Sequence, residues 1–303
     1  MKWRRGKRSA DLEDRRAGGG GGFGGMPLPI PRGKAGGGGL GLIAILLVFM
    51  LIRGCGDGGG DGGFDVPGLP TGTGQIPAQD TGSPIPEGSD PEAKQVDFVS
   101  FVLDDTQNFW AEQFSASGEP FQRAKLVLFR GAVASGCGQA SSATGPFYCP
   151  LDQKAYVDLS FFDELNRRFK APGDFAQAYV LAHEIGHHVQ QQLGIEGRVR
   201  SDSESSPDDA NELSVRLELQ ADCFAGLWGR SVYDQGLLES GDLEEGIVAA
   251  EAVGDDRIQE QAQGRIDPES FTHGTSEQRR EWFRRGFDSG QFSECDTFSA
   301  DEV

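Results

Sequence analysis

Residues 181–191 read Leu-Ala-His-Glu-Ile-Gly-His-His-Val-Gln-Gln, in which His183, Glu184 and His187 form an H-E-x-x-H motif inside a helix-compatible segment. Residues four apart face the same side of an α-helix, so the two imidazoles can bind one Zn²⁺ from successive turns. Glu184 lies between them and can deprotonate a water on the metal. The motif predicts a zinc hydrolase, and the alternative is a polar helix face that binds no metal.

A catalytic zinc site needs a third protein ligand and a fourth position left to water. Residues 212–226 predict a second amphipathic helix, in which Glu218 and Asp222 lie on one stripe. We expect Glu218 to be the third ligand and Asp222 to accept the N–H of a ligand histidine, which fixes the tautomer and angle of the ring. The reverse assignment, with Asp222 as the ligand, and a solvated acidic face are the alternatives.

These motifs carry a resemblance to a known family. The runs His183-Glu-Ile-Gly-His187-His and Glu218-Leu-Gln-Ala-Asp222-Cys-Phe-Ala-Gly are similar to the putative neutral zinc metallopeptidase family of bacterial membrane-anchored proteins. The resemblance spans nearly the whole chain apart from a variable linker, and includes the basic start of the chain, residues 147–150, 156–162 and 273–279. More distantly, H-E-x-x-H followed by E-x-x-x-D resembles the gluzincin peptidases, in which a glutamate completes the zinc site. The resemblance implies a zincin fold and peptidase chemistry, but no particular substrate.

The distribution of charge divides the chain into two parts. Residues 1–53 contain ten Lys or Arg and three acids, whereas residues 54–303 contain eighteen and forty-four. Residues 35–52 carry no charge and would span about 27 Å as a helix, enough for a bilayer core with Lys34 and Arg53 at the ends. We expect a single transmembrane helix over 35–53 with a cytoplasmic N-terminus. One rival interpretation is a cleaved signal peptide, which would need a far shorter charged lead. The other is a lipoprotein cleavage site before Cys55, which Arg53 fits poorly.

The predicted domains follow from this span: a basic Gly-rich cytoplasmic tail over 1–34, the transmembrane helix over 35–53, a linker over 54–92 and a zinc metallopeptidase domain over 93–303. The linker is rich in Gly, Pro and Asp and has few large apolar groups, which predicts disorder. The remaining residues, about 200, are enough for one hydrophobic core. We expect this domain on the periplasmic or extracellular side of the bacterial cytoplasmic membrane.

The patterning of the domain predicts an α+β fold that is mainly helical and zincin-like, with a small β-sheet. We expect helices at 96–114, 174–193, 209–235, 242–261 and 276–288, and short strands at 125–129, 147–148 and 155–159. In zincins, a strand near the metal helix pairs with extended substrate, and Tyr156 to Ser160 is the expected edge. A core strand without a substrate role is the alternative.

His273 lies on the predicted loop before the helix that begins at Ser276. It could donate a hydrogen bond to the oxyanion of a tetrahedral intermediate, or orient Arg279 to do so. The alternative is a structural role in bracing the loop. His188 points about 100° away from His187 and is not expected among the ligands.

Four of the five cysteines are candidates for disulfides. Cys137 and Cys149 flank a loop rich in Gly, Ser and Thr, as expected of a disulfide in an oxidising compartment. Cys223 could pair with Cys295 and fix the C-terminal tail beside the metal helix, or stay a buried thiol. Sequence alone does not decide the connectivity, because four cysteines allow three pairings. Cys55 is left over.

The function we expect is zinc-assisted hydrolysis of peptide bonds, with Glu184 moving the proton and Zn²⁺ as the cofactor. The alternatives are a non-catalytic zincin-like scaffold and an amidase of cell-wall peptides that uses the same zinc site. A structural zinc gains nothing from Glu184, which favours catalysis. The expected partners are a peptide or protein substrate and, through the N-terminal helix, the lipid bilayer. The acidity of residues 54–303 argues against nucleic acid, and the oligomeric state is not indicated.

Overall fold

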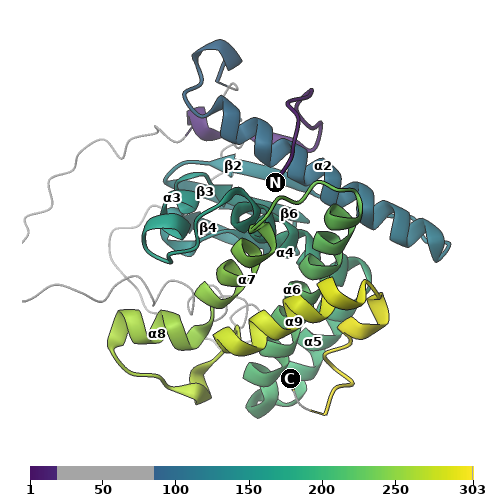
Figure 1. The fold of residues 1–303 in the computed structure, drawn as a ribbon. Helices are drawn as coiled ribbons and strands as arrows, with labels where there is room; N and C mark the ends of the chain where they lie inside the picture. The colour runs from purple at the N-terminus through teal and green to yellow at the C-terminus, as the bar shows by residue number, and fades with distance from the viewer. Residues whose placement is uncertain (19–84, 302) are drawn as a thin grey trace, which may run out of the picture.

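Two groups of elements make up the part of the chain that this computed structural model describes, residues 1–18, 85–301 and 303: a small β-sheet and the helices around it (Figure 1). The sheet has four strands in the order β1-β2-β6-β5. Strands β1 (Leu12–Asp14), β2 (Lys125–Phe129) and β6 (Lys154–Asp158) are parallel, and β5 (Phe147–Cys149) pairs with β6 in the antiparallel direction. A separate hairpin joins β3 (Ala132–Ser135) and β4 (Gly138–Ser141). The prediction of a mainly helical fold with a small sheet is confirmed.

The helical body begins with α2 (Ala93–Ala116), which lies along one side of the molecule (Figure 1). The ends of the later helices follow ordinary capping chemistry: α4 stops before Gly194 at φ 69°, and α9 starts at a capping box between Thr275 and Gln278. The remaining helices are α3 (Ser160–Arg167), α4 (Asp174–Gln192), α5 (Ile195–Ser205), α6 (Ala210–Asp234), α7 (Asp242–Ala252), α8 (Asp255–Gln263) and α9 (Ser276–Ser289).

Glycines set how closely the helices approach one another. A Cβ on Gly286 of α9 would lie 2.0 Å from the carbonyl oxygen of Cys223 in α6, so these two helices touch backbone to backbone. A Cβ on Gly186 of α4 would lie 3.1 Å from the carbonyl oxygen of Ala221. Helices α6 and α9 lie side by side in Figure 1. The H-E-x-x-H helix is therefore held close to α6.

Large aromatic side chains fill the core between the helices. Trp110 of α2 meets Phe224 of α6 edge-to-face at 5.1 Å between ring centroids, and Phe175 of α4 stacks on Trp228 of α6 at 5.8 Å. All four side chains are buried. Burial of each such side chain contributes about 2–3 kcal/mol, so α2, α4 and α6 share one hydrophobic core.

Residues 1–18 pack on this domain, although their charge predicts a separate tail. The guanidinium of Arg16 is buried and pairs with Asp14 and Asp90 at 2.6 Å each and with Glu92 at 2.9 Å. Trp3 packs edge-to-face on Phe98 of α2. Because Asp90 and Glu92 belong to this cluster, the end of the predicted 54–92 linker is also part of the domain. Three of the basic residues that indicated a tail, Arg5, Arg8 and Arg16, form ion pairs with acids at positions 90–97.

The predicted transmembrane helix over 35–53 lies outside the described residues, as does the linker up to residue 84. Within 1–18 and 85–303, the structure contains no helix with both the length and the apolar character needed to cross a bilayer.

Two further predictions are wrong. Strand β6 pairs with β2 on one side and β5 on the other, so Tyr156 is not at an edge, and Ser160 already belongs to α3. The edge on this side of the described sheet is β5. The helix predicted over 242–261 is broken at Gly254, where a Cβ would lie 2.4 Å from the backbone nitrogen of Ser276. The chain turns there because the start of α9 packs against it.

Candidate zinc site

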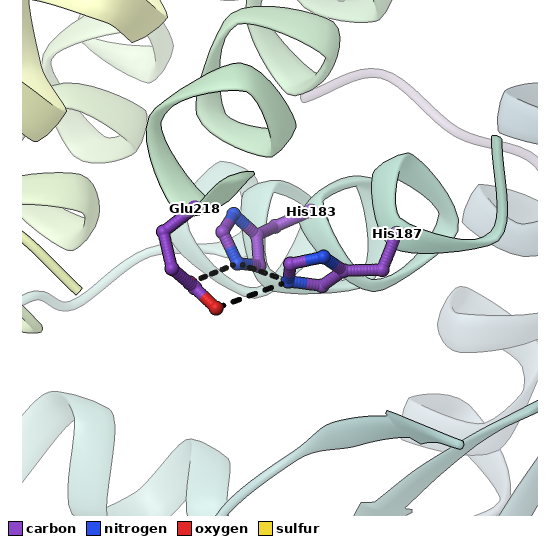
Figure 2. Close-up of side chains that lie close together, drawn as sticks. All are labelled: His183, His187 and Glu218. Carbon is purple, nitrogen blue, oxygen red and sulfur yellow. Dashed lines mark hydrogen bonds and ion pairs between the residues drawn. The ribbon is translucent and has the colours of Figure 1, made fainter. Parts of the chain in front are cut away.

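Three side chains from two helices converge on one point. His183 and His187 project from α4, and Glu218 faces them from α6 (Figure 2). The Nε2 atoms of the histidines are 3.2 Å apart, and the Glu218 carboxylate lies 3.2 Å from His183 Nε2 and 3.5 Å from His187 Nε2. The structure therefore brings the H-E-x-x-H histidines together with Glu218, and Asp222 lies behind them.

The spacing of these three atoms fits a zinc ion. Donors at 2.0–2.1 Å from a tetrahedral Zn²⁺ lie about 3.3 Å from one another. One other described group of acids is close enough to hold a metal, formed by Asp174, Asp242 and Glu245. That group is already neutralised in part, because the Met1 ammonium pairs with Asp174 and lies 3.1 Å from Asp242. The mixed nitrogen and oxygen donors of the first group are the set that zinc prefers.

The charges at the site also favour a cation. Burial alone would raise the pKa of Glu218, but the two neighbouring imidazoles hold it well below its usual range. Burial lowers the pKa of His187 to about 4. Burial would also lower the pKa of His183, yet the charge of Asp222 and its hydrogen bond raise it to about 10. Zinc binding is therefore expected to release a proton from His183.

Asp222 orients His183 from behind. Its carboxylate lies 2.8 Å from His183 Nδ1, so Nδ1–H donates to it and the lone pair of Nε2 points to the metal position. The hydroxyl of Tyr179 also donates to Asp222. Arg279 clamps the same carboxylate through Nε at 2.8 Å and Nη2 at 3.0 Å. Such a fully buried carboxylate is tolerated because each oxygen is hydrogen-bonded and its charge is paired.

The alternative role of Arg279, in which His273 orients it toward an oxyanion, is wrong. Arg279 is buried, and its guanidinium donates to Asp222, to Tyr179 Oη and to the backbone oxygen of Val253. The imidazole of His273 instead lies 3.1 Å from Asp255. Arg279 therefore fixes the carboxylate of Asp222, which in turn orients the candidate zinc ligand His183.

His273 lies on the loop before α9, with 30% of its side chain exposed. Asp255 accepts hydrogen bonds from the backbone N–H groups of Thr272 and His273 at 2.7 Å each, so the imidazole and its loop share one carboxylate. Burial lowers the pKa of His273, but the hydrogen bond and charge of Asp255 outweigh it and raise the pKa. The charge of His273 also acts on Glu184 and Glu218. Asp255 thus fixes His273 on the loop before α9 and stabilises its protonated form.

Glu184 is the carboxylate of the site that has no partner among the described residues. It is 6% exposed, and no described side chain or backbone group donates a hydrogen bond to it. Burial raises its pKa to about 7. A carboxylate with these properties can take up and return a proton near neutral pH.

His188 is not among the converging donors, as expected. Its Nδ1 lies 2.9 Å from the Tyr148 hydroxyl of β5, and its Nε2 donates to the backbone oxygen of Gln122 at 2.6 Å. His188 therefore fastens the metal helix to the edge strand of the sheet.

Both predicted disulfides are present. Cys137 pairs with Cys149 and Cys223 with Cys295, with Cα atoms 5.8 and 5.5 Å apart. The second bond joins α6 to the C-terminal helical turn η6 (Phe292–Cys295). Its cysteine on α6, Cys223, directly follows Asp222 in the sequence.

Sequence reasoning missed three residues of the site: Tyr179, Gln190 and Asp255. Tyr179 and Gln190 lie one turn before His183 and one turn after His187, so helical spacing would have found them. Asp255 is brought to His273 by the break at Gly254, and no local pattern indicates that contact.

A histidine pair on one helix, completed by a glutamate from a second helix, defines a zinc metallohydrolase type of site. A family model described as putative neutral zinc metallopeptidase matches residues 1–298, and the chain belongs to this family. It is 53% identical to Uncharacterized protein YpfJ of Escherichia coli (strain K12) over 237 residues, which cover 78% of this chain and 81% of the relative. It is 44% identical to Uncharacterized protein Rv2575 of Mycobacterium tuberculosis (strain H37Rv) over 194 residues, 60% of this chain and 65% of the relative. No solved structure matches the chain.

Proposed function

We propose that this protein is a zinc-dependent peptidase that hydrolyses peptide bonds at the outer face of a bacterial membrane. The observation that carries the proposal is the group formed by His183, His187 and Glu218, whose donor atoms have the mutual spacing of tetrahedral zinc ligands. The carboxylate of Glu184, which has no hydrogen-bond partner among the described residues, supplies the proton acceptor that a purely structural zinc does not need. Membership of the family supports the same chemistry.

Each polar residue of the site has a separate task in this proposal. When bound, zinc supplies a Lewis acid that polarises the scissile carbonyl and lowers the pKa of water toward about 7. Glu184 takes the proton of the attacking water and then passes it to the leaving amine. His273, held by Asp255, donates a hydrogen bond to the oxyanion of the tetrahedral intermediate. Asp222 and Arg279 keep His183 in the tautomer that leaves Nε2 unprotonated.

Strand β5 is the element we propose for binding the backbone of an extended peptide. It is the strand at the edge of the sheet on this side, and Tyr148 within it is hydrogen-bonded to His188 of the metal helix. A peptide that pairs with β5 obtains backbone hydrogen bonds without a sequence requirement. The spacing between the peptide and the zinc ligands is then set by the contact between Tyr148 and His188.

The proposal is tested on the purified full chain, because a fragment over 93–303 would lack Arg16 and strand β1. Elemental analysis is expected to give about one zinc per chain. A mixed peptide library should be cleaved, with cleavage lost on chelation and restored by zinc. Zinc binding without cleavage of any peptide would instead favour a scaffold, and cleavage confined to cell-wall peptides would favour an amidase. Cleavage that persists in zinc-free protein contradicts the proposal.

We expect the pH profile of hydrolysis to report on Glu184 and His273. Glu184 must be ionised, and its pKa of about 7 falls further beside a zinc cation, so the acid limb lies below pH 7. The pKa of His273 is raised, so its protonated form is present below that pKa and is lost as pH rises through it. This loss produces the alkaline limb of kcat. In His273→Gln we expect kcat to fall by about 10²-fold and the alkaline limb to disappear. An unchanged limb in that variant contradicts the role of His273.

For the location, we propose that residues 1–18 and the domain lie together outside the cytoplasm, with residues 35–53 as the membrane-associated segment. Two disulfides support an oxidising compartment. A single crossing by 35–53 would separate Arg16 from Asp90 and Glu92, whereas the ion pairs join them. We therefore propose that the protein is associated with the membrane and that its N-terminus is not cytoplasmic.

This arrangement predicts equal labelling of two exposed sites in intact cells. In a Cys55→Ser background, single cysteines at Lys7 and at Leu151 should both react with a membrane-impermeant maleimide. Reaction at position 151 alone would restore the single-pass topology and place residues 1–18 in the cytoplasm.

A further inference from the structure

The two histidines of the site are supported in different ways. His183 Nδ1 meets the carboxylate of Asp222, on the neighbouring helix α6. His187 Nδ1 lies 2.9 Å from Oε1 of Gln190, one turn further along its own helix α4. Gln190 is fully buried. An amide in such a place needs partners for all its polar atoms, because an unsatisfied buried group costs about 1–3 kcal/mol.

The amide of Gln190 is fixed by acceptors on α6. Its Nε2 donates to the backbone oxygen of Leu217 at 2.7 Å and to Oε1 of Gln220 at 3.1 Å. With the NH₂ group committed to these acceptors, Oε1 must face His187 as an acceptor. Nδ1 of His187 then carries the hydrogen, and its Nε2 presents a lone pair to the metal position.

The connection continues to the C-terminal segment. Gln220 is buried, and its Nε2 donates to the backbone oxygen of Cys295 at 2.9 Å. Cys295 is joined to Cys223 of α6 by the second disulfide. The residues that follow are also tied to α6, because Arg216 donates to the backbone oxygen of Ala300 at 2.9 Å and Thr297 donates to the backbone oxygen of Arg216.

We propose that Gln190 and Gln220 are positioning residues for the second zinc histidine, and that the disulfide-linked C-terminal turn η6 is their outer support. The inference rests on the proposed zinc site. The hydrogen-bond acceptor behind His187 is then the neutral amide of Gln190, whereas the acceptor behind His183 is the carboxylate of Asp222. A second carboxylate behind the ligands would weaken the net positive charge of the loaded site, whereas an amide fixes the ring without adding charge.

The test measures Zn²⁺ affinity of the full chain by competition with a chelator. Gln190→Leu should bind zinc about 10–100-fold more weakly, the usual effect of removing a partner of a zinc histidine. Gln220→Leu should weaken binding in the same direction by less. Gln191→Leu is the matched control, because Gln191 is the next residue of α4 and lines a surface hollow with Gly194 and Ser201. Its affinity should equal that of the wild type.

A double variant separates a connected arrangement from general loosening of the fold. If Gln220 acts through Gln190, the variant with both substitutions should bind zinc no more weakly than Gln190→Leu alone. Losses that add fully, or a Gln190→Leu variant that binds zinc as tightly as Gln191→Leu, overturn the proposal. If Gln190→Leu does not fold, Gln220→Leu alone decides the outcome. A wild-type zinc affinity in that variant would contradict the proposed role of Gln220 and η6.

The two disulfides provide the second comparison. Replacing both Cys223 and Cys295 by Ser should weaken zinc binding, whereas replacing both Cys137 and Cys149 by Ser should not. Equal affinity in the two variants contradicts a role for η6. A wild-type chain that binds no zinc would defeat the proposed function itself, whereas a chain that binds zinc but cleaves no peptide leaves this inference standing.

Discussion

Replacing Glu184 by Gln is expected to abolish peptide hydrolysis while the zinc content stays near one ion per chain. The substitution keeps the size of the side chain and removes the group that carries the proton from water to the leaving amine. General acid–base catalysis contributes typically about 10²–10⁴-fold, so we expect kcat to fall by about that factor, or about 3–5 kcal/mol in the activation free energy.

Glu184 suits this test because its carboxylate has no hydrogen-bond donor among the described residues, so the substitution removes no hydrogen bond to them. The unfolding temperature of Glu184→Gln should therefore equal or exceed that of the wild type, since burial disfavours the ionised carboxylate and a neutral amide takes its place. The measurements are kcat on a cleaved peptide, zinc by elemental analysis and a thermal unfolding curve. Turnover retained within tenfold of the wild type would remove Glu184 from the mechanism.

Replacing Glu218 by Ala is expected to lower zinc affinity more than any substitution behind the ligands, by about 10³-fold or more, because it removes a direct donor rather than a supporting group. The two candidate acids differ in their surroundings. Glu218 faces the histidines and lies 3.9 Å from Arg279, whereas Asp222 accepts two hydrogen bonds from that guanidinium.

The comparison variant Asp222→Ala should therefore damage the fold as well as the metal site. It leaves the buried Arg279 without its carboxylate, and breaking such a pair costs about 3–5 kcal/mol. Glu218→Ala should lose zinc with a much smaller change in the unfolding free energy of the zinc-free protein. Zinc titration and denaturant unfolding of both variants distinguish the two acids. Unchanged zinc content in Glu218→Ala would transfer the ligand role to Asp222.

Much of the helical body could be predicted from local patterns. The end of α4 follows from the stop at Gly194, and α9 begins at Ser276 as its sequence predicts. The elements that were not predicted are short or polar: β1, β3, β4, α3 and α5. The three strands span three or four residues each, too few for an alternating pattern to stand out, and α5 has few apolar residues to indicate a buried face.

The errors about the N-terminus and the substrate strand have one origin. Charge alone predicts a tail for residues 1–18, but the partners of Arg16 include Asp90 and Glu92, more than 70 residues away. Sequence spacing does not contain the order of the strands, so it cannot show that β6 is paired on both sides and that Tyr156 is not at an edge.

The amino-acid sequence by itself determined the metal-binding half of the site. A helix repeats every 3.6 residues, so the spacing of His183 and His187 is enough to put both rings on one face, with Glu184 between them. Only the tertiary structure decided which carboxylate meets the histidines, how Arg279 is used, and that Asp255 supports His273. Those contacts depend on how closely α4, α6 and α9 pack at Gly186 and Gly286, and on the chain turning at Gly254. Local spacing determines geometry within one helix, whereas geometry between helices follows from the packing of the whole core.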